Sequence, residues 1–102
     1  MVRKTLAAVA LLAGMAASLL AQAQTQKNDS QAAMTPSQAL AILKEGNQRF
    51  ASGIRASRDF GAQVRATASG QYPFAAIVSC MDSRAPVEIL FDQGIGDVFS
   101  LR

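Results

Sequence analysis

The sequence of 102 residues contains no histidine, no tryptophan and a single cysteine, Cys80. A lone cysteine has no partner within the chain, so a small fold held by internal disulfides is excluded. Histidine and cysteine are the usual ligands of zinc, and one such residue cannot complete a tetrahedral site. Any zinc bound here would need further ligands from outside these residues.

Charge is also scarce, with ten basic residues against seven acidic ones and a formal net charge of +3. Two of the bases, Arg3 and Lys4, lie at the very start of the chain. The other bases are scattered and do not alternate with aromatic residues, as a surface that stacks and neutralises nucleic acid requires. We therefore expect no nucleic-acid partner.

The first 23 residues have the pattern of a secretory signal peptide. Arg3 and Lys4 are followed by the uncharged run Leu6–Leu20, and Ala21-Gln22-Ala23 offers small residues at the cleavage positions. An uncleaved membrane anchor is the alternative, but the run is shorter than the ~20 apolar residues that a spanning helix needs. We expect residues 1–23 to be removed on export to an oxidising compartment such as the bacterial periplasm, with no membrane association afterwards.

The remainder divides into a polar lead-in and one domain. Residues 24–34 have little to bury and are expected to form a flexible linker. The domain would occupy residues 35–102 and begin with a helix from Pro36 to about Ser52, since Thr35 and Gln38 form a capping box. Gly53 would end that helix. Its apolar face would hold Leu40, Leu43 and Phe50, with Lys44, Glu45 and Arg49 in water.

The second half of the domain has the pattern of an α/β fold. A second helix is expected over residues 60–69, a strand buried on both faces over 74–79, and a second strand over 97–102. A helix starting at Pro86 and ending at Gly94 would connect the strands, which makes them parallel. Since two parallel strands cannot cover both of their faces, we expect this chain to be the front part of a longer protein.

Three polar side chains follow the first predicted strand of the sheet: Cys80, Asp82 and Arg84. The carboxyl ends of parallel strands are where open α/β sheets bind their ligands. A thiolate is a soft zinc ligand, and an arginine can hold a nearby carboxylate with two hydrogen bonds. Two alternatives remain: a structural loop in which Asp82 caps the next helix, and a nucleophilic Cys80 activated by Arg84.

Four ordered blocks of this sequence resemble the front half of the β-class carbonic anhydrases. The resemblance runs from Thr35 to Arg102 and covers about two thirds of the chain. The blocks are the helix segment from Ala39-Leu40 through Gly46-Asn47-Gln48-Arg49-Phe50, then Gly70-Gln71-Tyr72-Pro73-Phe74, Cys80-Met81-Asp82-Ser83-Arg84 and Phe91-Asp92-Gln93-Gly94-Ile95-Gly96-Asp97-Val98-Phe99.

The resemblance implies a role for each residue of the candidate site. Cys80 would be a ligand of Zn²⁺, and Asp82 and Arg84 would form the catalytic pair. In an open form Asp82 would accept a hydrogen bond from water on the metal, and in a closed form Asp82 itself would be a metal ligand. Gln71 would bind carbon dioxide or bicarbonate, and Phe99 would form an apolar wall of the substrate pocket.

The implied activity is the zinc-dependent, reversible hydration of carbon dioxide to bicarbonate and a proton, carried out by a homodimer or higher homo-oligomer. The family's His-x-x-Cys motif, which supplies the remaining zinc ligands, is absent from these 102 residues. We expect it in a longer gene product. The alternative is a truncated, non-catalytic relic or oligomerisation fragment without a complete metal site.

Overall fold

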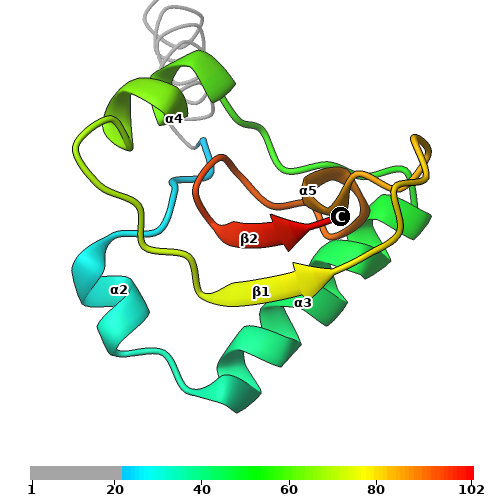
Figure 1. The fold of residues 1–102 in the computed structure, drawn as a ribbon, viewed down its shortest axis with the longest axis horizontal. Helices are drawn as coiled ribbons and strands as arrows, with labels where there is room; N and C mark the ends of the chain where they lie inside the picture. The colour runs from blue at the N-terminus through cyan, green and yellow to red at the C-terminus, as the bar shows by residue number, and fades with distance from the viewer. Residues whose placement is uncertain (1–21) are drawn as a thin grey trace, which may run out of the picture.

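The computed structural model describes residues 22–102, so most of the predicted signal peptide lies outside the described residues (Figure 1). In chain order the elements are α2 (Asn28–Ala32), α3 (Pro36–Ala51), α4 (Phe60–Ala66), β1 (Ala75–Val78), α5 (Val87–Leu90) and β2 (Val98–Leu101). Helices followed by a parallel β-α-β unit confirm the predicted α/β class. No helix in this part of the chain has the length and apolar character needed to cross a membrane.

Helix α3 begins and ends as predicted. The Thr35 hydroxyl accepts from the Gln38 backbone N–H at 3.2 Å, while the Gln38 side chain accepts from the Thr35 N–H at 2.8 Å. Pro36 occupies the first turn, where its missing N–H costs no intrahelical bond. After the last helical residue Gly53 has a φ of 72°, a left-handed conformation that terminates helices.

Helix α4 begins at the predicted residue but is shorter than expected. The Asp59 side chain accepts a hydrogen bond from the Ala62 N–H at 2.9 Å and so caps the helix. The helix ends at Ala66 rather than Ser69, and its last turn is closed by the Thr67 hydroxyl, which donates to the Gln63 carbonyl at 2.8 Å. Such side-chain bonds to the backbone favour helix termination.

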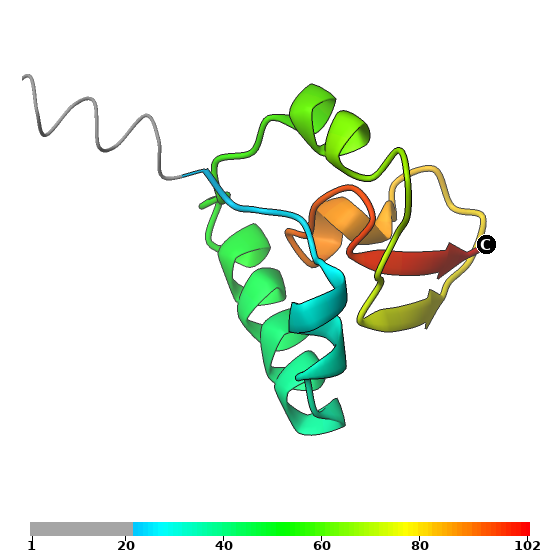
Figure 2. The same ribbon diagram turned by 90° about the vertical axis from the view of Figure 1, so that its left-hand side faces the viewer.

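Strands β1 and β2 pair in parallel, with Ala75 opposite Val98 and Val78 opposite Leu101. The expectation that β1 is buried on both faces is wrong, because Val78 is 81% exposed and burial alternates along the strand. Helix α3 passes behind β1 in Figure 1 and lies on one side of the sheet in Figure 2. The other face, which carries Phe99 and Leu101, has no layer over it among the described residues.

A close backbone contact joins α3 to α5. Gly46 is buried, and a Cβ on this residue would lie 1.8 Å from the Phe91 carbonyl oxygen. Next to it, the Asn47 side-chain amide donates to the Leu90 carbonyl at 2.9 Å. Only glycine allows the two helices to approach this closely, so Gly46 sets the position of α5.

Arg49 was expected in water and is only partly so, because its 34% exposed side chain pairs with the buried residue Asp92 at 2.6 Å. Arg58 makes a second ion pair with the same carboxylate at 2.5 Å, and the Ala56 N–H donates to it at 3.0 Å. Asp92 also has a positive φ of 46°, which turns the chain sharply after α5. This cluster fastens the segment after α3 to the end of α5.

Residues 24–34 were expected to form a flexible linker. In the structure this segment contains α2, and the residues just before α2 pack against the domain. Thr25 is only 8% exposed, and the Gln26 N–H donates to the buried Asp97 carboxylate at 2.8 Å. The segment therefore gains its order from partners about 70 residues away, which no local sequence pattern reveals.

Candidate active site

The loop from Ser79 to Ala85 leaves the carboxyl end of β1, where the sequence predicted the site. The Ser79 N–H donates to the Leu101 carbonyl at 2.8 Å and extends the pairing of β1 with β2 by one residue. Cys80 follows with a free, exposed thiol. Because the thiol is accessible, it is available as a ligand or as a nucleophile.

Asp82 and Arg84 form a tightly bonded pair in this loop. Asp82 Oδ1 accepts from the Arg84 backbone N–H at 2.8 Å and from Arg84 Nε at 3.0 Å, while Asp82 Oδ2 accepts from Arg84 Nη2 at 2.8 Å. This two-pronged geometry fixes both the position and the plane of the carboxylate. The structural alternative, in which Asp82 caps the following helix, is wrong, because Pro86 is the N-cap of α5 and Asp82 bonds to Arg84 instead.

The electrostatics of the pair favour an ionised carboxylate. Hydrogen bonds from the Arg84 side chain, and then from its backbone N–H, lower the pKa of Asp82 below its ordinary value of 3.8. Desolvation acts in the opposite direction, and the charge of Arg102 adds a further lowering of the pKa. Side-chain hydrogen bonding to Asp82 raises the pKa of Arg84. At neutral pH the Asp82 carboxylate is therefore ionised, so it can accept hydrogen bonds but cannot donate one.

Arg102, at the end of β2, also contacts this loop. Its Nη2 atom donates to the Asp82 carbonyl oxygen at 2.6 Å, and the same oxygen accepts from the Ala85 N–H at 3.1 Å. The sequence alone did not predict this contact. The parallel register could have suggested it, because pairing of Val78 with Leu101 brings the next residue of each strand to the same edge of the sheet.

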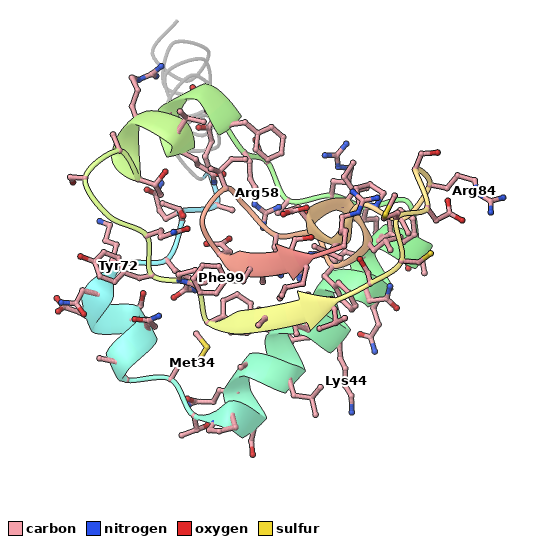
Figure 3. All side chains as sticks on the ribbon, in the orientation of Figure 1. Met34, Lys44, Arg58, Tyr72, Arg84 and Phe99 are labelled. Carbon is pink, nitrogen blue, oxygen red and sulfur yellow. The ribbon has the colours of Figure 1, made fainter. Side chains whose placement is uncertain are left out.

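The structure does not bring Gln71 and Phe99 to this loop within one copy of the chain. Gln71 is exposed and precedes β1, at the opposite end of the sheet from Cys80. Phe99 is half exposed and pairs with Ala76, which lies four residues, or about 13 Å of strand, before Cys80. In Figure 3 Phe99 lies over the sheet, while Arg84 projects beyond the far end of β1.

The described residues do not assemble a metal site on their own. No group of three histidine, cysteine, aspartate or glutamate side chains that could hold an ion is found between residues 22 and 102. The loop offers at most a thiolate from Cys80 and a carboxylate from Asp82.

Comparisons with known proteins are consistent with this loop and fold. Residues 75–102 match the family model described as carbonic anhydrase. Over 68 residues the chain is 47% identical to "Carbonic anhydrase 2" of Mycobacterium tuberculosis. This aligned segment covers 66% of this chain and 33% of that protein. It is 44% identical over 68 residues to "Carbonic anhydrase" of Mycolicibacterium smegmatis, with the same coverage.

The geometry defines an α/β protein that presents a Cys-x-Asp-x-Arg loop at the carboxyl end of its first strand. Together with the matches, this identifies the sequence as belonging to the carbonic anhydrases, and its motifs are those of the β class. The chain spans about a third of the length of the curated relatives that it matches.

Proposed function

We propose that the protein, in a form that includes the remaining metal ligands, catalyses the zinc-dependent, reversible hydration of carbon dioxide to bicarbonate and a proton. The observation that carries the proposal is the Asp82–Arg84 pair in the loop that also bears Cys80. The names of the relatives support the same reaction. Because the matched segment covers only 33% of each relative, the proposal concerns the whole protein.

The donors in the loop suit zinc in part. A cysteine thiolate is a preferred zinc ligand, and a carboxylate is an acceptable one. We place the other ligands, the family's histidine and second cysteine, outside the described residues. When bound, zinc would supply the Lewis acidity that makes water a nucleophile near neutral pH.

Asp82 would orient the nucleophile by accepting a hydrogen bond from it. A carboxylate oxygen can accept two hydrogen bonds. Asp82 Oδ1 already accepts two from Arg84, whereas Oδ2 accepts one, at 2.8 Å. Oδ2 therefore retains an acceptor position, and Arg84 holds it in a fixed direction. Such positioning contributes to rate because the reactants need not search for the reactive geometry.

The separation of Gln71 and Phe99 from Cys80 supports a homodimeric site. If both residues contact substrate, as the family resemblance implies, a second copy of the chain would have to supply them. A mixture of full-length Cys80→Ala and Gln71→Ala subunits tests this arrangement. In a mixed dimer, one of the two sites would combine the intact Gln71 of the first variant with the intact Cys80 of the second. Recovery of turnover on mixing supports a shared site, and no recovery contradicts it.

The decisive experiment uses the longer gene product, with zinc content and carbon dioxide hydration measured on the same samples. We expect about one zinc per subunit, and a loss of turnover of roughly 10- to 100-fold in Asp82→Asn and Arg84→Ala, the range seen when groups that orient a metal site are removed. Arg65→Ala, which changes an exposed arginine of α4, is the matched control. Unchanged turnover in the two loop variants would refute the assigned roles.

A non-catalytic relic is the second candidate, favoured by the lack of any group of three ligands within residues 22–102. The same measurement separates the two functions. A product that retains no zinc and hydrates no carbon dioxide would establish the relic. We also propose export to the periplasm, supported by the signal-like pattern of residues 1–23.

A further inference from the structure

The segment before α2 is fastened to the domain by buried polar contacts. We name residues 22–26 the N-terminal strap. The Thr25 hydroxyl lies 2.5 Å from the Ile95 carbonyl oxygen and 3.2 Å from Asp97 Oδ1, and the Gln26 N–H donates to the same Asp97 atom at 2.8 Å. Asp97 is 3% exposed, so these bonds are shielded from water.

The strap is also bonded on both sides of Ala23. The Ala23 N–H donates to the Ser57 carbonyl at 2.8 Å, and the Ala23 carbonyl accepts from Gln63 Nε2 at 3.1 Å. Gln63 is 5% exposed, and its Oε1 accepts from the Ile95 N–H at 3.0 Å. One buried glutamine of α4 therefore connects the strap to the turn before β2. Figure 2 shows the strap running below α4 on its way to α2.

These contacts involve the peptide bond at which the signal peptide is expected to end. A leader peptidase must bind the chain in an extended form and add one water across the Ala23–Gln24 bond, leaving a carboxylate on Ala23 and an ammonium group on Gln24. In the folded domain the carbonyl that would be attacked is held by Gln63, and Thr25 is buried two residues beyond it. Bonds held in this way are cleaved only from locally opened states.

We propose that docking of the N-terminal strap protects the Ala23–Gln24 bond, so that the leader is removed much faster before this domain folds than afterwards. Cleavage would eliminate the contacts of Ala23 but leave those that Thr25 and Gln26 make with Asp97, so the mature chain can still dock. The strap thus sets the order of two events, processing first and folding second. The inference rests on the predicted leader and is independent of the proposed carbon dioxide chemistry.

The test is cleavage of the longer gene product, with its leader still attached, by a purified bacterial leader peptidase in detergent, followed by mass spectrometry. The same chain is compared when folded, as judged by circular dichroism, and when unfolded in urea at a concentration that the peptidase tolerates. We expect release of residues 1–23 to be slower from the folded chain by about tenfold or more. Equal rates would overturn the proposal, as would failure of the unfolded chain to be cut after Ala23.

A pair of glutamine variants isolates the strap contact. Gln63→Ala removes the donor to the Ala23 carbonyl, and because Gln63 is 40 residues away in the sequence, the change leaves the peptidase's recognition sequence intact. The control Gln48→Ala changes an exposed glutamine of α3. With both variants folded, Gln63→Ala should be cleaved several-fold faster than Gln48→Ala. Equal rates would overturn the proposal. If Gln63→Ala fails to fold, Thr25→Val replaces it, with its rate in urea correcting for any effect on recognition.

Discussion

Replacing Asp92 with asparagine removes the negative charge on which two arginines depend. Asp92 is 4% exposed, and the Arg58 side chain that pairs with it is 8% exposed, so Arg58 would be left buried without a counter-ion. Asparagine has nearly the same shape and tolerates the positive φ of this position, so the change isolates the charge. The structure therefore predicts an electrostatic loss rather than a steric one.

The expected loss of folding free energy is about 3 kcal/mol, the lower end of the range for leaving one partner of a buried ion pair alone. The pair with Arg49, whose side chain is 34% exposed, adds little because solvent screens it. For a domain of this size, 3 kcal/mol corresponds to a fall in the thermal midpoint of more than roughly 10 °C. Total stability is itself only about 5–15 kcal/mol, so much of the variant could unfold at growth temperature.

Urea denaturation followed by circular dichroism measures this loss. Glu45→Gln is the matched control, since it removes an exposed carboxylate of α3 and should change the unfolding free energy by no more than about 0.5 kcal/mol. If Asp92→Asn were as stable as this control, the buried cluster would not hold the domain together, and the reasoning from burial and pairing would be refuted.

Two further predictions concern the same region. Gly46→Ala should destabilise the domain by at least about 2 kcal/mol in urea denaturation, because the new Cβ would collide with the Phe91 carbonyl. Gly61→Ala is the control and should be tolerated, because no atom would lie closer than 3.4 Å to its Cβ. Equal stabilities of the two variants would refute the tight contact. Acid should weaken the fold through Asp92: burial raises the pKa of its carboxyl, but the bonds from Arg49 and Ala56 and the charge of Arg58 outweigh this and lower it. The stabilisation is then present above the unfolded pKa of about 3.9 and is lost as the pH falls through the lower folded value. The stability gap between wild type and Asp92→Asn should therefore close below about pH 4, and a gap that persisted there would contradict this assignment.

The candidate site was predictable where its contacts are local. Asp82 and Arg84 are two residues apart, so a short loop suffices to bring them together. Arg102 reaches the same loop only because β1 and β2 pair in one register. The spacing of residues along the sequence therefore could not predict this contact. The separation of Gln71 from Cys80 likewise depends on the direction of β1 and not on any motif.

The sequence by itself determined the helices with strong end signals, the parallel order of the strands and the composition of the Cys80–Arg84 loop, because each depends on neighbouring residues. Only the tertiary structure decided which polar residues are buried. Asp92, Gln63 and Asp97 look like ordinary surface residues in the sequence, yet they join segments more than 30 residues apart. A polar side chain is buried only where the fold supplies its hydrogen-bonding partners, and that supply is a property of three-dimensional packing.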